Sequence, residues 1–392
     1  MKKFLLICVL CGGSGHLRAQ SSIPAILQSV EQNNTTLKAL RADGETQKLN
    51  NRTNLNLADP EVEFGYMWGD PKHTGPRKNY AVRQELDMAV ISGSKRQSAR
   101  ERNNLIGDNY RNDRMELLLQ AEQLCISAVY CNRRSEQLKM RKQTAEKINE
   151  LYQKMFRTGE IGKPEQNKAA LNTVKYQGEL ERNEIEKQAI LAELSGMNGG
   201  TGVMLSEKVY SDKRLPEDFE SWFTTTAGTW PALAVASRQT SVEKRNIRQT
   251  RTESLPSLTI GYAQEDVPEQ SFKGATIGLS IPLWSKRNKL KSAKSAYLTA
   301  QMNEQDLRTR LHARLSGLYR KAESLQRTTG YYRKALKELN NIELSFKALK
   351  AGEISLQDYL TEAEMYYDTI DLLEQSEYEY AQTLSELLAV EL

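Results

Sequence analysis

The chain is long, polar on average and almost balanced in charge, and these properties limit what it can do. It has 392 residues, with 55 Lys and Arg against 50 Asp and Glu, and a mean hydropathy of −0.63. Such balanced charge argues against nucleic acid as a partner. No run of about eighteen apolar residues occurs, so the sequence offers no candidate for a membrane-spanning helix.

The first nineteen residues resemble a cleaved secretory signal. Lys2 and Lys3 precede an apolar run from Phe4 to Leu10, and Ala19 stands where cleavage is expected. A lipoprotein signal ending at Cys11 is the alternative, although the residues before it are not the small ones that acylation favours. Cleavage after Ala19 would leave 52 basic and 50 acidic residues, a net charge of +2.

Two cysteines, Cys125 and Cys131, would remain in the exported chain. They are six residues apart on one predicted helix, so their Cα atoms would lie about 9 Å apart. This distance is too long for a disulfide, and we expect two packed thiols.

A first repeat is predicted over residues 20–196. A helix is expected from Ser22 toward Leu57, followed by a β-hairpin over 59–88 in which apolar and polar residues alternate, as in a strand with one apolar face. The apolar residues in alternation are Val62, Phe64, Tyr66, Trp68, Tyr80, Val82, Leu86 and Met88. Between Pro76 and Pro164 there is no proline, and a helix from Lys95 to Arg157 would be about 95 Å long. A return helix is expected to end at Gly196.

Residues 197–226 are rich in glycine and polar side chains, which predicts a linker, and a second repeat is predicted over 227–392. Thr229-Trp230-Pro231 opens a helix there, and a β-hairpin is expected over 255–284. Its apolar residues again alternate with small or polar ones: Leu258, Ile260, Tyr262, Ala275, Ile277 and Leu279. No proline follows Pro282, so a second long helical hairpin is expected.

The same twelve-residue segment ends the first helix of each helical hairpin. Residues 150–161 and 343–354 are identical at six of twelve positions, including the Gly-Glu-Ile sequence that begins at Gly159 and at Gly352. A helix commonly ends on a left-handed residue, which glycine adopts without steric cost. Each segment is therefore predicted to form the tip of a helix-turn-helix.

Two strand pairs with one apolar face, in an exported protein, favour a membrane β-barrel with lipid outside and water inside. Open sheet edges are not tolerated in lipid, and four strands are too few to close a barrel, so several chains would have to contribute. A soluble β-sandwich attached to a coiled coil is the alternative. That alternative does not explain why a long helix follows the strand pair at the same position in each repeat.

The duplicated strand pair and helical hairpin resemble the TolC-type outer membrane efflux family over residues 22–392. The shared features include the helix openings at Asn33-Asn34-Thr35-Thr36-Leu37 and Pro231-Ala232-Leu233 and the glycine at each tip. The resemblance implies a homotrimer with a twelve-stranded β-barrel continuous with an α-barrel, located in the cell outer membrane and extending through the periplasm. It also implies two partners, a periplasmic adaptor protein and an inner-membrane transporter of the RND type. Residues 64–71 are similar to the heavy-metal efflux branch.

Several residues are candidates for function within this picture. Asp358, Glu362 and Glu165 follow the tips and are candidates for a pore constriction, with an ordinary charged helix face as the alternative. Gly159, Glu160, Gly352 and Glu353 are expected to contact the adaptor. The residues expected to face lipid are Phe64, Tyr66, Trp68, Leu258, Ile260, Tyr262, Ile277 and Leu279.

No catalytic motif, cofactor or metal site is predicted. His73 falls in a predicted loop and His312 is isolated on a helix, so neither has visible metal-binding partners. The sequence therefore predicts a passive exit duct of a tripartite efflux system. A non-transporting, exported coiled-coil scaffold is the alternative from another functional class.

Overall fold

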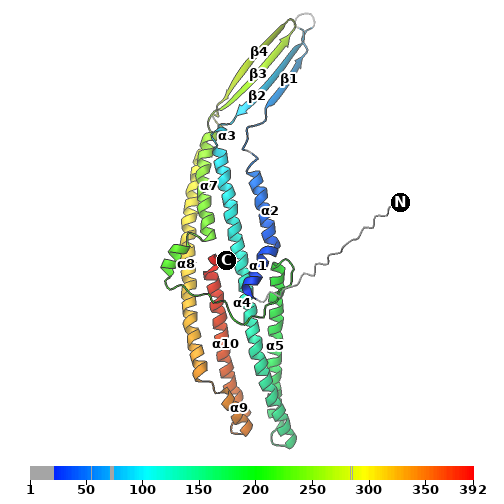
Figure 1. Cartoon of the computed structure of the whole chain (residues 1–392), viewed down its shortest axis with the longest axis vertical. Helices are drawn as coiled ribbons and strands as arrows, with labels where there is room; N and C mark the ends of the chain where they lie inside the picture. Colours follow the sequence, from blue (N-terminus) through cyan, green and yellow to red (C-terminus); the bar gives the residue numbers. More distant parts are fainter. Residues whose placement is uncertain (1–21, 54, 71–74, 283, 285) are drawn as a thin grey trace, which may run out of the picture. The chain divides into compact units, whose positions relative to one another are not determined.

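A computed structural model of the chain describes residues 22–53, 55–70, 75–282, 284 and 286–392. The predicted signal segment and His73 lie outside these described residues. Each repeat contains a helix, two strands and a helical hairpin (Figure 1). None of the helices in the described ranges combines the length and apolarity needed to cross a bilayer.

The first repeat begins with two helices, α1 (Ile23–Asn33) and α2 (Thr35–Asn50), where a single helix toward Leu57 was expected. That expectation was wrong because Asn34 interrupts the helix: its side-chain oxygen accepts a hydrogen bond of 2.9 Å from the backbone N–H of Leu37. Asparagine favours this capping position because it satisfies an N–H that the helix itself leaves unpaired. The pair β1 (Glu61–Met67) and β2 (Arg77–Leu86) follows, and the short helix α3 (Met88–Ile91) leads into the hairpin.

The hairpin of the first repeat consists of α4 (Ser94–Thr158) and α5 (Lys163–Met197). At 65 residues, α4 is a continuous helix about 97 Å long. Its bounds lie within one residue of the predicted ones, and α5 ends one residue beyond the predicted Gly196. The long uninterrupted helix is therefore confirmed.

The second repeat contains α7 (Pro231–Glu253), β3 (Ser257–Val267), β4 (Gln270–Ser280), α8 (Lys289–Glu338), α9 (Ile342–Ala351) and α10 (Leu356–Leu387). A 3₁₀ turn at Ala389–Glu391 follows. The expected long helix is broken between α8 and α9 at Leu339, Asn340 and Asn341. No proline or glycine marks this break. Adjacent asparagines are weak helix formers because their side chains compete for backbone hydrogen bonds.

The predicted linker at 197–226 is irregular at first and then forms α6 (Phe219–Thr226). Contacts divide the chain into two compact units, each of which draws on both repeats. One unit comprises the residues up to Asn33, Ala121–Ser211 and Asn340–Glu374, and the other comprises Asn34–Gln120, Asp212–Leu339 and Gln375–Leu392. In the second unit, aromatic residues of α6 pack in a core with Leu311 and Leu315 of α8.

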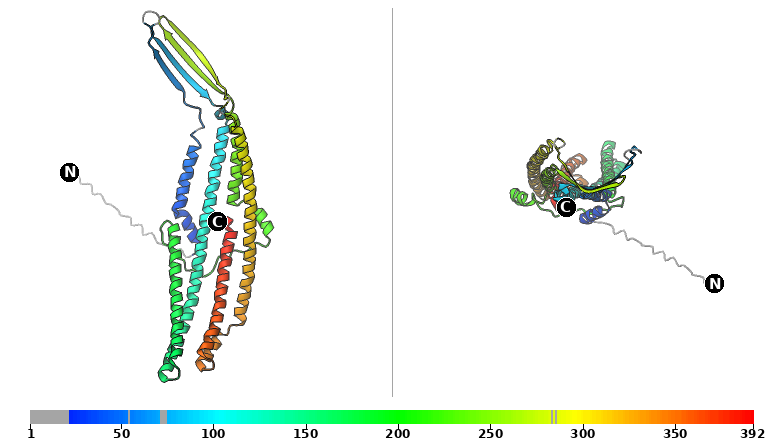
Figure 2. Two further views of the ribbon diagram at one scale, coloured as in Figure 1. Left: turned by 180° about the vertical axis from the view of Figure 1, so that it is seen from behind. Right: turned by 90° about the horizontal axis from the view of Figure 1, so that it is seen from above.

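The four strands form one antiparallel sheet in the order β1-β2-β3-β4, shown side by side in Figure 2. The two hairpins are joined through β2 and β3, for example at Val82 opposite Tyr262. Two residues, Pro268 and Glu269, connect β3 to β4, and Glu269 has a positive φ of 70°. Among the residues that the structure describes, strands β1 and β4 each have one edge that pairs with no other strand.

Candidate functional site

One face of the sheet is apolar across all four strands. The register places Phe64 opposite Tyr80, Val82 opposite Tyr262, and Ile260 opposite Ile277. Directly opposed residues share a face, so the alternation predicted for separate hairpins adds up to a single surface. We call this surface the apolar sheet face; its members are Val62, Phe64, Tyr66, Tyr80, Val82, Leu86, Leu258, Ile260, Tyr262, Ala275, Ile277 and Leu279.

No described segment of the chain covers the apolar sheet face. Val62 and Ile277 are 78% and 79% exposed, and Phe64 and Leu279 are 62% and 63% exposed. Trp68 lies one residue beyond the end of β1, and its ring contacts that of Tyr66 at a centroid distance of 5.4 Å. A monomeric soluble protein rarely leaves so large a continuous apolar surface in water.

On the side of the hairpin loops, the apolar sheet face ends at polar and charged residues. Lys78, Gln264 and Lys273 continue the same face toward the loops, beyond Tyr80, Tyr262 and Ala275. At the other end, Leu86, Leu258 and Leu279 remain apolar, and Ile281 and Trp284 are exposed just beyond β4. From Ala275 to Ile281 the band is about 20 Å long at 3.4 Å per residue, slightly less than the band of about 25 Å that membrane barrels present to lipid.

The opposite face of the sheet carries small and charged side chains. Arg83 pairs with Glu63 at 2.9 Å, and Arg77 pairs with Glu265 at 2.7 Å. A side chain at Gly261 would lie 2.6 Å from the backbone oxygen of Val82, so glycine is required there by close packing. The sheet is therefore amphipathic, with a polar face suited to water.

The helical hairpin tips have the predicted geometry. Gly159 and Gly352 have φ values of 80° and 77°, in the left-handed region that favours glycine. At each tip the residue after the glycine donates a backbone hydrogen bond to the preceding helix. The N–H of Glu160 donates to the carbonyl oxygen of Met155, and the N–H of Glu353 donates to that of Ala348, both at 2.9 Å. These bonds satisfy carbonyls that the helix end would otherwise leave unpaired.

The candidate constriction carboxylates have a local structural role at the same tips. Asp358 accepts a hydrogen bond of 2.6 Å from the hydroxyl of Ser355, and the hydroxyl accepts one of 3.1 Å from the N–H of Asp358. Glu165 accepts a bond of 2.8 Å from the N–H of Gly162. Both carboxylates thus cap the start of a helix, α10 and α5 respectively. Glu362 lies one turn further along α10 and is exposed.

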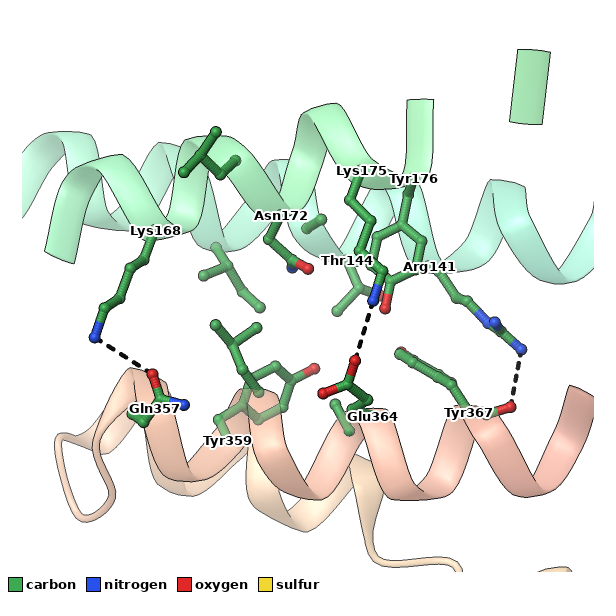
Figure 3. A pocket seen from close by; sticks show the side chains of 15 residues that line it. Arg141, Thr144, Lys168, Asn172, Lys175, Tyr176, Gln357, Tyr359, Glu364 and Tyr367 are labelled. Atoms are coloured by element: carbon green, nitrogen blue, oxygen red, sulfur yellow. Dashed lines mark hydrogen bonds and ion pairs between the residues drawn. The ribbon is translucent and has the colours of Figure 1, made fainter. Parts of the chain in front are cut away.

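A buried arginine links α4 to α10 in the unit that contains both tips. Arg141 is 4% exposed on its side chain, and its guanidinium donates to the two carboxylate oxygens of Asp371 at 2.5 and 3.0 Å. It also donates to the backbone oxygen of Tyr367 at 3.3 Å and lies over that tyrosine's ring (Figure 3). Burial opposes the charge, but the hydrogen bond and charge of Asp371 outweigh it and raise the pKa of Arg141. Sequence reasoning missed this arginine, since no motif surrounds it.

A cavity of about 350 Å³ lies beside this arginine, between α4, α5 and α10. Lys175 of α5 pairs with Glu364 of α10 at 3.3 Å, and Lys168 donates to Gln357 across the same space (Figure 3). Tyr176 is buried there, and burial raises its pKa. Nearer the tips, a core joins the two hairpins around Tyr359, which is 2% exposed.

The remaining polar candidates are packed. His312, expected to be isolated, lies 3.2 Å from both carboxylate oxygens of Glu220 and contacts the rings of Phe219 and Phe223. Cys125 and Cys131 are free and buried, as expected, and burial raises the pKa of Cys125 to about 12. Within the described ranges, no group of three His, Cys, Asp or Glu side chains is arranged to hold a metal ion.

The fold is that of known outer membrane channels. No protein-family model and no curated protein matches the sequence. Solved structures do match: a membrane protein from Pseudomonas aeruginosa has a TM-score of 0.77 at 13% identity, over 95% of this chain and 90% of that one. The CmeC outer membrane channel of Campylobacter jejuni has a TM-score of 0.74 at 15% identity, with 94% and 85% covered. The outer membrane protein VceC from Vibrio cholerae has a TM-score of 0.76 at 11% identity, with 94% and 95% covered. The chain therefore has the fold of the TolC-type outer membrane channels.

Proposed function

We propose that the chain is an outer membrane channel, the passive exit duct of a tripartite efflux system. Three chains would close one twelve-stranded barrel from their four-stranded sheets and extend into the periplasm as an α-barrel of long hairpins. Substrates would arrive from an inner-membrane transporter of the RND type through a periplasmic adaptor. The fold shared with CmeC and VceC supports this proposal.

The observation that carries the proposal is the apolar sheet face together with the open edges. The residues of the apolar sheet face alternate along the four strands with the small and charged residues of the other face, and most of them are exposed within the described residues. Exposing the apolar face to water would be unfavourable, and so would exposing the polar face to lipid. An interface with lipid on one side and water on the other suits both.

The open edges explain why the barrel would need several chains. In lipid, an unpaired N–H or C=O costs several kcal/mol, because no water is present to replace the missing hydrogen bond. About half of the 11 residues of β4 direct these groups away from β3. Pairing β4 of one chain with β1 of the next would satisfy them, and three chains would complete the circle.

The tips are proposed to form the periplasmic end. Gly159, Glu160, Gly352 and Glu353 would contact the adaptor, since they lie in the exposed turns between helices. Asp358, Glu362 and Glu165 would narrow the entrance as rings of three. Capping bonds leave Asp358 and Glu165 exposed, so capping a helix and lining a pore are compatible roles.

The test is to purify the full chain from bacterial outer membranes and to measure its mass and its conductance. We expect a heat-modifiable species with the mass of three chains, which forms ion-conducting pores in planar bilayers. A single chain that remains in the soluble periplasmic fraction and conducts no ions would refute the proposal. That result would favour the coiled-coil scaffold, although a scaffold function does not explain the apolar sheet face.

A further inference from the structure

Beneath the sheet, the segment that leads into α8 is strongly basic. Residues 286–294 contain five Lys or Arg, and no acidic residue occurs from 286 to 303. The segment follows Ile281 and Trp284, the exposed apolar residues at the end of the apolar sheet face. Basic residues thus begin where the apolar band ends.

Three of these cations are exposed at the start of α8. Lys291 and Lys294 are three residues apart and share a face of the helix, and Arg287 lies in the turn just before the helix begins at Lys289. All three are exposed, whereas Ala300 and Leu311, on the opposite side of α8, are buried. Within the described parts of the chain, none of the three forms an ion pair with a carboxylate. We call these three residues the basal basic surface.

The basal basic surface lies close to the sheet. A cavity of about 540 Å³ at the base of the sheet is lined by the strand-end residues Ser257 and Ser280 together with Trp284 and Lys286. Lys286 shares that cavity with acidic residues, so we leave it out of the surface. Lys294 is only five residues into α8, about 7.5 Å along the helix axis. This rise is similar to the Debye length of about 8 Å at physiological salt, so Lys294 would still sense charges at the level where α8 begins.

Helix stability does not account for this charge. Lys291 stands in the first turn of α8, where the helix dipole disfavours cations, and that turn contains no acidic residue. The neighbouring helices are also basic at the same level. Arg96 and Arg100 near the start of α4, and Arg248 and Arg251 near the end of α7, are exposed and form no ion pair in the described chain.

We propose that the basal basic surface binds the anionic headgroups of phospholipids in the leaflet on the helix side of the membrane. The inference rests on the proposed function, since it requires the apolar sheet face to lie in lipid. An exposed tryptophan followed by clustered Lys and Arg suits this boundary, because the indole ring sits at headgroup depth and the cations attract anionic lipids.

The α2 helix of a second copy is a poorer occupant. Most residues of α2 are exposed, but its sequence contains Lys38, Arg41 and Lys48 against Asp43 and Glu45. Glu45 is already paired with Lys48 at 2.7 Å. The net charge of α2 is therefore positive, and it would repel the basal basic surface.

The experiment compares lipid contacts of the full chain reconstituted in phosphatidylcholine vesicles. Electron paramagnetic resonance of spin-labelled phosphatidylglycerol and phosphatidylcholine measures which lipid the protein immobilises in preference. The test variant is Arg287→Gln, Lys291→Gln, Lys294→Gln. The matched control, Arg308→Gln, Arg320→Gln, Lys321→Gln, removes three exposed cations of the same helix at least 21 Å further from the sheet, at about 1.5 Å per residue.

We expect the wild type and the control to prefer phosphatidylglycerol about fivefold, and the test variant to lose most of this preference, with the remainder due to the other exposed cations at the same level. In 1 M NaCl, where the Debye length is about 3 Å, the wild-type preference should also disappear. Equal immobilisation of both lipids by an inserted wild-type protein would overturn this inference and leave the channel intact. Failure of the wild type to insert into vesicles would instead refute the proposed function. Loss of the trimer in the test variant alone would show that the cations bind a second copy, which also overturns the inference.

Discussion

Replacing Ile277 by arginine places a charge in the middle of the apolar sheet face. Ile277 lies on β4 opposite Ile260 and is 79% exposed within the chain. It is two residues from Ala275 and four from Ile281, so the charge would lie about 7 Å and 14 Å from the two ends of the apolar band. A lipid-facing arginine at this depth should cost about 2 to 4 kcal/mol per chain, or about 6 to 12 kcal/mol for a trimer that carries three copies.

The neighbouring residue provides a matched control. Thr276 lies on the same strand but on the polar face, opposite Gly261, which contributes no side chain. Thr276→Arg should therefore cost less than about 1 kcal/mol if that face lines a water-filled lumen. The two variants differ by one position in sequence and carry the same new side chain.

The assay is the yield of heat-modifiable trimer in the outer membrane fraction, together with urea unfolding of trimers reconstituted in vesicles. We expect Ile277→Arg to abolish or strongly reduce the trimer, and Thr276→Arg to give nearly wild-type yield. Equal loss in both variants would refute the reasoning, because it would mean that the two faces of the sheet meet the same environment.

The remaining predictions concern the tips and the buried thiol. Gly352→Val should cost about 1 to 3 kcal/mol locally, because valine is strained at a φ of 77°, and should reduce dye export by cells while trimer yield stays normal. Gly178→Ala, in the interior of α5 with no atom near the added methyl group, should leave export unchanged. Asp358→Asn combined with Glu362→Gln should lower the cation selectivity of single channels, since a ring of carboxylates concentrates cations; unchanged selectivity would place the constriction elsewhere. The thiol of Cys125, whose pKa burial raises to about 12, should resist iodoacetamide at pH 9 until the protein unfolds. Because the unfolded thiol ionises first, unfolding should become easier as the pH rises from about 9 toward 12, and Cys125→Ala should remove that contribution.

The sheet could be predicted from the sequence because the alternation of apolar and polar residues repeats every two positions and can be read within one strand. A two-residue alternation identifies the apolar side of each strand, and the register confirms the assignments that fall within the paired strands. Trp68 lies just beyond β1, and Met88, expected in the hairpin, instead begins α3. Gln84, a polar residue between Val82 and Leu86 on that side, donates to the backbone oxygen of Ala58 at 2.8 Å. The tips were also predictable, since a glycine at the end of an apolar stripe has a specific steric meaning.

Interruptions of the helices were harder to predict. Asn34 and the Leu339–Asn341 break carry no proline, and periodicity continues across each of them. Only the competition between asparagine side chains and the helical backbone marks these positions, and that preference is worth about 1 kcal/mol or less. The pairing of Arg141 with Asp371 could not be predicted, because it joins residues 230 positions apart on helices whose mutual rotation depends on the packing of both hairpins.

The unpaired edges of β1 and β4 also bear on the kinetics of biogenesis. If the proposed channel forms, a lone chain in the bilayer would leave both edges unsatisfied in hydrocarbon, so insertion and association would have to occur together or association would have to come first. The rate at which channels appear should then rise more steeply than linearly with the concentration of exported chain, approaching the cube when three chains meet in the limiting step. A cell that makes little of the protein would accumulate unassembled periplasmic chains, exposed to proteases and chaperones, out of proportion to the reduction in synthesis.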